Sequence, residues 1–199
     1  MNITNQKRTA SLQRSTRETD ISVSVNLDGS GTAQVSSGLG FLDHMLTALA
    51  CHSSIDITLQ CKGDLHVDDH HSVEDCAIVL GRAIDAALGD RNDLARFGYS
   101  YAPLDESLAR CVIDLATRVH ATVNLQLTRE KIGDVACENL THWFVTLASS
   151  LRCTLHIDII RGENDHHKAE AAFKAFALAL KAAVSRTQPG RDISTKGSL

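Results

Sequence analysis

The chain has few prolines, few aromatic residues and no long apolar run. Its 199 residues include two prolines, and aromatic residues make up 4% of the composition while hydrophobic residues make up 43%. The longest apolar stretches are interrupted by Lys174 or Lys181, so no transmembrane helix and no membrane partner are expected. The N-terminal residues 1–17 are polar and lack the apolar segment of a signal peptide. These absences favour an ordinary globular protein of the cytoplasm.

Neither the charge nor the cysteines indicate a special partner or compartment. The formal net charge is −4, without the basic excess that nucleic-acid binding requires. The six cysteines never form Cys-x-x-Cys, and most stand among apolar residues. This pattern is typical of buried reduced thiols rather than of disulfides or zinc ligands.

What the sequence does contain is a His-His-x-x-Glu motif that occurs twice. The first copy consists of His70, His71 and Glu74, and the second of His166, His167 and Glu170. Apolar residues recur at helical spacing after each copy, so each copy is predicted to open a helix. Neighbouring histidines diverge by about 100° around a helix, which makes it hard for both to bind one ion. The doubled pair therefore suggests two metals.

The repeat extends upstream of both motifs. Each half is predicted to have a short amphipathic helix with an early histidine, His44 or His142, followed by an alternating strand and then by the His-His helix. The offset from His44 to His142 is 98 residues, whereas the two His-His motifs are 96 residues apart. A duplication with a small deletion explains both offsets.

The segments before these helices alternate polar and apolar residues and are expected to be strands. Residues 21–27 form the first strand, residues 28–31 supply a turn, and residues 32–36 are expected to return as the second arm of a hairpin. In the second half the alternating runs cover 97–102, 108–115 and 119–127. This order predicts an α+β fold with an internal duplication: two similar halves, each a β-sheet covered on one face by two helices, with the helical layers packed together. We expect a single domain built of two repeats, about 1–92 and 93–199.

Together the halves offer six histidines and two carboxylates as metal ligands: His44, His70, His71, Glu74, His142, His166, His167 and Glu170. Divided evenly, each ion receives three imidazoles and one carboxylate, which leaves open positions for a substrate. Such a ligand set disfavours Mg²⁺ and Ca²⁺ and suits Mn, Fe, Co, Ni or Zn, and six-coordination favours manganese or iron. Asp69 and Asp165 precede the pairs, where a carboxylate can cap a helix or hold a histidine ring. The alternative is that each pair is a polar helix start exposed to water.

Eight stretches resemble the imidazoleglycerol-phosphate dehydratase family of histidine-biosynthesis enzymes. They include Phe41-Leu-Asp-His-Met-Leu46 and Ser194-Thr-Lys-Gly197, with the others at 14–20, 63–75, 95–98, 104–106, 162–170 and 173–175, all in the family's order. The resemblance implies a hydro-lyase that converts imidazole glycerol phosphate to imidazole acetol phosphate. It also implies two Mn(II) ions per active site, with Fe, Co, Ni or Zn as substitutes. Trimers assembling into a 24-subunit homo-oligomer, with active sites between neighbouring subunits, are implied as well.

The resemblance also implies roles for individual residues. Imidazolate held between the two metals expels the hydroxyl, and Glu18 serves as acid/base, although on its own Glu18 is typical of a solvated loop residue before a strand. Contacts to the substrate or its phosphate are implied for Arg96, Arg118, Lys174, Ser194, Lys196 and His52. Lys174 lies four residues after Glu170, hence on the ligand-bearing helix face. Taken alone, Arg96 is typical of a surface charge, and His52 equally fits a cation at a helix C-terminus.

Five positions depart from the family's usual pattern, one of which is Thr117 in place of Gly. Ala48 stands where the family often has Gln, so any substrate contact by that Gln is lost, and Ser53 stands where it often has Gly. Val119 and Ile193 replace prolines, which leaves the local turns open. The metal ligands alone also fit two other classes of protein. One is a dinuclear metallohydrolase that activates water, and the other is a binuclear metal store, which would need neither Glu18 nor the phosphate-binding cations.

Overall fold

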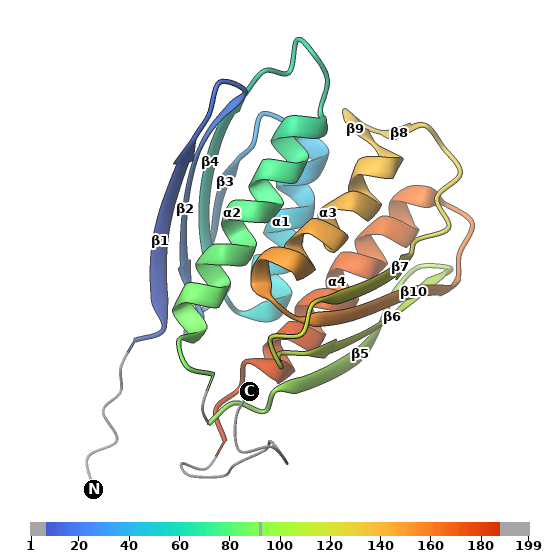
Figure 1. Ribbon diagram of the computed structural model, residues 1–199. Coiled ribbons are helices and arrows are strands. Elements are labelled where there is room, and N and C mark those ends of the chain that lie inside the picture. The colour runs from blue at the N-terminus through green and yellow to red at the C-terminus, as the bar shows by residue number, and fades with distance from the viewer. Residues whose placement is uncertain (1–6, 92, 188–199) are drawn as a thin grey trace, which may run out of the picture.

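Two similar β-sheets enclose the helices of the protein (Figure 1). The computed structural model describes residues 7–91 and 93–187. The first half contains β1 (Thr9–Ser15), β2 (Thr19–Asn26), β3 (Ala33–Ser36), α1 (Gly40–Ser53), β4 (Asp56–Gly63) and α2 (His70–Leu88). The second contains β5 (Phe97–Leu104), β6 (Ser107–Asp114), β7 (His120–Asn124), β8 (Lys131–Ile132), β9 (Val135–Ala136), α3 (Cys137–Leu151), β10 (Thr154–Arg161) and α4 (Asp165–Ala183). The strand orders β1-β2-β4-β3 and β5-β6-β10-β7 match position by position, which confirms the predicted duplication.

The third strand does not pair as predicted. β3 is not the second arm of a hairpin with β2; it lies parallel to β4, with Ala33 opposite Ile57. β2 instead forms a hairpin with β1, with Ser15 opposite Asp20, and pairs antiparallel with β4 on its other side. The strand β1 was not predicted from the sequence. β3 and β4 are parallel because α1 connects them, and a helical crossover returns the chain in the same direction. The crossover through α3 places β7 parallel to β10 in the same way.

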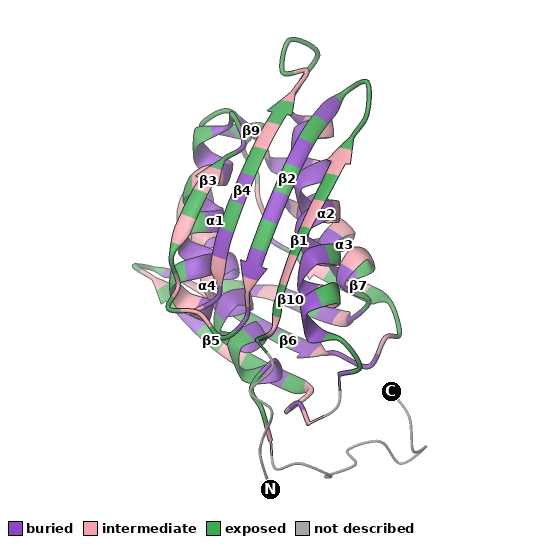
Figure 2. Ribbon diagram, turned by 90° about the vertical axis from the view of Figure 1, so that its left-hand side faces the viewer, coloured by how far each residue is buried: buried purple, intermediate pink, exposed green. Residues whose placement is uncertain are grey.

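One face of each sheet is buried under helices, as predicted (Figure 2). Along β2, buried Ile21 and Val23 alternate with exposed Ser22 and Ser24. Helix α2 packs on β1 and β2, and α4 packs on β5 and β6, while α2 contacts α3 and α1 contacts α4 across the middle. The two helical layers therefore share one apolar core, which brings helices from different halves together.

Aromatic side chains fill the centre of the helical layers. Trp143 and Phe144 of α3 are fully buried, and so is Phe173 of α4. The ring centroids of Phe144 and Phe173 lie 4.5 Å apart. Helix α4 also approaches β5 closely, because a Cβ atom at Gly98 would stand 1.9 Å from the carbonyl oxygen of Ala179. These contacts fix α3 and α4 relative to the second sheet.

The cysteines are free thiols, as predicted. Cys76, Cys111, Cys137 and Cys153 are buried. Burial raises the pKa of the Cys153 thiol to about 12, so this thiol stays protonated at neutral pH. Among the described residues, no helix has both the length and the apolar character needed to cross a membrane.

Candidate metal centres

Each His-His motif stands at a helix start, as predicted. Helix α2 begins at His70 and α4 at Asp165. The side chain of Asn164 caps α4 by accepting a hydrogen bond from the backbone N–H of His166. The backbone N–H of His70 donates to Oδ1 of Asp68 at 2.9 Å. The cap of Asn164 and the contact of Asp68 hold the first turns, from which the histidine and glutamate side chains leave.

The first cluster joins α2 to α3 and is called the α2–α3 cluster below. Nε2 of His142 lies 2.9 Å from Oε1 of Glu74, and Nε2 of His70 lies 4.0 Å from Oε2 of the same carboxylate. The rings of His70 and His142 stack with their centroids 5.1 Å apart. Ligand atoms of all three residues lie within 4.8 Å of one another. The cluster therefore combines a His-His-x-x-Glu motif with the upstream histidine of the other half.

The α1–α4 cluster is its counterpart, formed by His44, His166 and Glu170. Oε2 of Glu170 lies 3.0 Å from Nε2 of His44 and 3.3 Å from Nε2 of His166. Nζ of Lys174 lies 2.8 Å from Oε1 of the same carboxylate. Desolvation raises the pKa of Glu170, but hydrogen bonds with Lys174 and His44 outweigh it and lower the pKa to about 2. Glu170 is therefore ionised at neutral pH, as a metal ligand must be.

The second histidine of each pair lies outside the clusters of its own chain. Nδ1 of His71 lies 3.1 Å from both carboxylate oxygens of Asp64, and Nδ1 of His167 lies 2.6 Å from Oε2 of Glu106. Hydrogen bonding to Asp64 raises the pKa of His71, and hydrogen bonding to Glu106 raises that of His167. In both rings a carboxylate holds Nδ1 and leaves Nε2 available to a ligand.

Glu106 also holds the loop before α4, a role that was not predicted from the sequence. Its Oε1 atom accepts backbone hydrogen bonds from Asn164 at 2.9 Å and from Glu163 at 3.2 Å. The bond from Asn164, together with that from His167, lowers the pKa of Glu106 far below its usual range. The repeat could have indicated Glu106 as a site residue, because Glu106 and Glu18 occupy matching turns, one before β6 and the other before β2.

Glu18 lies in the turn between β1 and β2. Its backbone N–H donates to Oγ1 of Thr16 at 3.1 Å, and its carbonyl accepts from the backbone N–H of Asp64 at 3.0 Å. Its side chain is 55% exposed, with Oε1 3.7 Å from Nε2 of His71. The structure thus places Glu18 beside His71 and outside both three-residue clusters.

The predicted phosphate-binding residues are spread over the chain. Lys174 contacts the α1–α4 cluster directly. The backbone N–H of Arg96 donates to the carbonyl of Ala183, at the end of α4 opposite to His166. The guanidinium of Arg96 pairs with Asp114, with Nε 2.7 Å from Oδ1. Within one subunit, Lys174 lies at the middle of α4, whereas Arg96 lies at its C-terminal end.

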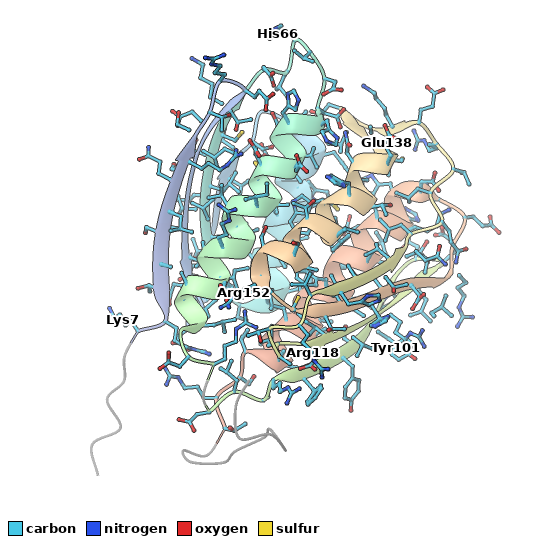
Figure 3. The ribbon with its side chains drawn as sticks, viewed as in Figure 1. Lys7, His66, Tyr101, Arg118, Glu138 and Arg152 are labelled. Atoms are coloured by element: carbon cyan, nitrogen blue, oxygen red, sulfur yellow. The ribbon has the colours of Figure 1, made fainter. Side chains whose placement is uncertain are left out.

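Arg118 and His52 also lie away from the clusters of their own chain. Figure 3 shows Arg118 toward the end of α3 that is followed by Arg152, whereas Glu138 lies at the start of that helix. His52 stands in the last turn of α1, where its charge would suit a helix C-terminus. The predicted contacts Ser194 and Lys196 lie outside the described residues.

Asp69 reaches a histidine ring indirectly, through a residue that the sequence did not single out. Oδ2 of Asp69 accepts from Nδ2 of Asn139 at 2.9 Å, and Oδ1 of Asn139 lies 2.9 Å from Nδ1 of His70. Asp165, the counterpart of Asp69, accepts from the backbone N–H groups of Thr128 and Arg129 and pairs with Lys168. The one signal for Asn139 is its place three residues before His142, on the same helix face.

Comparison with known proteins identifies relatives across nearly the whole chain. The family model described as imidazoleglycerol-phosphate dehydratase matches residues 37–180. An imidazoleglycerol-phosphate dehydratase of Phytophthora nicotianae is 54% identical over 192 residues, which are 96% of this chain and 42% of that longer protein. One of Chlorobium chlorochromatii is 51% identical, and the match covers 96% of this chain and 97% of the relative. The chain thus spans under half of the first relative and almost all of the second.

Solved structures agree with this assignment. The imidazoleglycerol-phosphate dehydratase of Staphylococcus aureus superposes with a TM-score of 0.82 at 36% identity, covering 90% of this chain and 99% of that one. The enzyme of Pyrococcus furiosus, solved in complex with (S)-C348, gives a TM-score of 0.81 at 34% identity, covering 94% and 100%. By sequence and by fold, the chain belongs to the imidazoleglycerol-phosphate dehydratase family of hydro-lyases.

Proposed function

We propose that the chain dehydrates imidazole glycerol phosphate to imidazole acetol phosphate, a step of histidine biosynthesis, with two Mn(II) ions per active site. The observation that carries the proposal is the presence of two clusters of the same composition, each with two imidazoles and one carboxylate. Family membership supports the reaction, and the clusters supply the ligands. The proposed ligands are His44, His70, His71, Glu74, His142, His166, His167 and Glu170.

The donor atoms fit a metal of the manganese type. Imidazole nitrogen combined with carboxylate oxygen suits Mn, Fe, Co, Ni or Zn. Bonds of about 2.1 Å place neighbouring ligand atoms of an octahedral ion about 3 Å apart. The closest nitrogen–oxygen spacings in the two clusters are 2.9 Å at Glu74 and 3.0 Å at Glu170. In each cluster one nitrogen–oxygen pair therefore has the spacing that metal binding requires, and the third ligand atom lies within 4.8 Å.

His71 and His167 support an active site shared between subunits. Their Nδ1 atoms are held by carboxylates, and their Nε2 atoms take no part in the clusters of their own chain. Supplied by a neighbouring subunit, each ring completes a set of three imidazoles and one carboxylate. Arg96 and Arg118, at the far ends of α4 and α3, reach a metal centre in the same way. A 24-subunit assembly of trimers provides such neighbours.

Sharing can be tested by mixing two inactive variants. His142→Ala breaks the α2–α3 cluster but leaves His71 intact, whereas His71→Ala does the reverse. Because the intact groups lie on different subunits, dissociating the two variants and reassembling them together is expected to restore part of the activity. Each variant reassembled alone is the control. Mixed assemblies as inactive as the controls would argue against sharing.

The reaction breaks the C–OH bond beside the imidazole ring and removes a proton from the next carbon, releasing water and an enol that becomes the ketone. The Mn(II) ions, when bound, supply positive charge that favours the deprotonated imidazole ring of the substrate. Glu18 transfers the carbon-bound proton, since its exposed carboxylate stands on a turn fixed by hydrogen bonds beside His71. The phosphate is held by charge-assisted hydrogen bonds. Its proposed partners are Arg96, Arg118, Lys174, Ser194 and Lys196, with His52 as a further substrate contact.

A direct assay tests the proposal. The chain is stripped of metal with a chelator, reloaded with Mn(II) or with Mg(II) as control, and incubated with imidazole glycerol phosphate. Formation of the ketone, followed by NMR, is expected with Mn(II) and not with Mg(II). Hydrolysis of a phosphoester would instead indicate a metallohydrolase, and metal exchange without turnover would indicate a metal store. Either result without ketone formation contradicts the proposal.

A further inference from the structure

The two metal centres are built differently around the same donor atoms. We infer that the α2–α3 cluster binds its ion more tightly than the α1–α4 cluster, because Asn139 positions His70 and nothing equivalent positions His166 within the described ranges. Asn139 is then a positioning residue, acting on the metal through His70. This inference rests on the proposed function only in requiring that both clusters bind metal.

The orientation of the Asn139 amide is determined by its neighbours. Oδ2 of Asp69 accepts hydrogen bonds from the backbone N–H of Ala136 at 2.8 Å and from Nδ2 of Asn139 at 2.9 Å. A carboxylate can only accept, so the amide nitrogen of Asn139 must face Asp69. Its oxygen must then face His70. Both Asp69 and Asn139 are buried, which protects this arrangement from competing water.

The amide oxygen in turn determines the tautomer of His70. Oδ1 of Asn139 lies 2.9 Å from Nδ1 of His70, and an amide oxygen accepts, so Nδ1 carries the hydrogen. The lone pair is left on Nε2, the atom that faces Glu74 and His142. The ring is therefore held in the tautomer and orientation that a metal needs before any ion arrives. Such a partner increases electron density at the ligand nitrogen and lowers the ordering cost of binding.

In the part of the chain that the structure describes, the α1–α4 cluster has no counterpart of the Asn139 amide. Phe41 stands three residues before His44, where Asn139 stands three residues before His142. The ring of Phe41 contacts His166 edge to face, with the centroids 5.1 Å apart. A phenyl ring offers no comparable acceptor, and within residues 7–91 and 93–187 no hydrogen-bond partner reaches Nδ1 of His166. The ring of His166 is therefore positioned by packing and by the contact of its Nε2 atom with Glu170, without a partner that fixes its tautomer from Nδ1.

A second difference acts in the same direction. Nζ of Lys174 lies 2.8 Å from Oε1 of Glu170, so an ammonium group competes with the ion for the carboxylate that would bind it. The corresponding position four residues after Glu74 is Ile78, which offers no cation. The carboxylate of Glu74 therefore binds a metal ion without competition from a lysine at that position.

Metal titration tests the inference without any assay of activity. Metal-free, assembled protein is titrated with Mn(II), with heat and the EPR signal of free Mn(II) as readouts. Two binding events are expected, with dissociation constants that differ about tenfold or more, the effect typical of a lost outer partner. His142→Ala should remove the tighter event and His44→Ala the weaker one. Equal constants, or the reverse assignment, overturn the inference and leave the proposed function standing, whereas no Mn(II) binding overturns both.

Variants at the positioning residue make the test specific. Asn139→Leu removes the amide at similar volume and is expected to weaken the tighter event about 10- to 100-fold while the weaker one changes no more than about twofold. Phe41→Leu, at the matching place in the other half, takes away no hydrogen bond and keeps an apolar side chain against His166, so it should change each constant no more than about twofold. Asp69→Asn serves where Asn139→Leu fails to fold, because an amide at position 69 no longer forces the orientation of Asn139. Equal weakening of both events, or no weakening, overturns the inference.

Discussion

Oε1 of Glu18 lies 3.7 Å from Nε2 of His71, so the carboxylate of a hairpin turn stands beside the imidazole at the start of α2. The side chain of Glu18 nevertheless remains 55% exposed, and the carboxylate can therefore face a substrate. Both residues lie outside the three-residue clusters of their own chain. Together they would enter the shared active site from the same side.

Glu18→Gln is expected to abolish most turnover without releasing the metals. The amide keeps the shape of the side chain but cannot accept a proton, so kcat should fall about 10²- to 10⁴-fold, the range for general acid/base groups. Metal content by mass spectrometry and substrate affinity should stay close to wild type. Glu130→Gln, an exposed loop carboxylate, is the matched control. Near-normal turnover of Glu18→Gln would remove Glu18 from the acid/base role.

The contact between His167 and Glu106 predicts a pH dependence of the metal-free fold. Hydrogen bonding to Glu106 raises the pKa of His167. A raised pKa means that this stabilisation is complete below the unfolded value of about 6.5 and is lost as the pH rises through the folded value. Glu106→Gln removes the charge, so its Tm should fall less than that of wild type as the pH rises. Thermal melts between about pH 5.5 and pH 8.5 measure this. Equally steep curves for both proteins would contradict the linkage.

Helix starts and fold class could be predicted, because they depend on local patterns. Apolar residues at helical spacing after each His-His pair placed the starts of α2 and α4. The divergence of neighbouring side chains around a helix also predicted that His70 and His71 serve different sites, and His70 lies in the α2–α3 cluster whereas His71 lies outside it. The partner of β3 could not be predicted, since alternation identifies the buried face of a strand but not its neighbour. Each cluster takes its ligands from both halves of the chain. This arrangement depends on the contacts of α2 with α3 and of α1 with α4, which the sequence does not indicate.

Buried polar residues with partners far away in the chain could not be predicted from the sequence. Asn139 donates a hydrogen bond to Asp69, which lies 70 positions away in the chain, and Arg91 donates to the carbonyl of Leu151, which lies 60 positions away. Nothing in the residues beside either one indicates the partner. Arg91 stands between the two repeats, and the structure buries its guanidinium. Its contacts lead to a prediction about stability.

Arg91→Ala is expected to destabilise the fold strongly. Nη1 of Arg91 donates to the carbonyl oxygens of Leu115 at 2.8 Å and Arg152 at 3.0 Å, and Nη2 lies 2.5 Å from Oδ1 of Asp85. Truncation leaves the carbonyl oxygens without this donor and Asp85 with Arg152 as its remaining cation, which should lower the free energy of unfolding by about 3–5 kcal/mol. Arg152→Ala removes a 52% exposed arginine from the same Asp85 and should lower it by about 1 kcal/mol or less. Urea unfolding compares the two variants, and equal losses would contradict the buried role.

Removal of residues 194–199 is expected to weaken substrate binding. The phosphate needs several cationic donors, yet the ammonium of Lys174 is already engaged by Glu170 at 2.8 Å. Lys196 and Ser194, in the family-like C-terminal stretch, are the proposed additional donors. Hydrogen bonds to charged groups are worth about 1.5–3 kcal/mol, so the truncated chain and Lys196→Ala should each show KM raised about tenfold or more. Lys181→Ala, an exposed lysine whose ammonium donates to Oγ of Ser54, is the control and should keep its KM. An unchanged KM in the truncated chain would count against a phosphate-binding role for the tail.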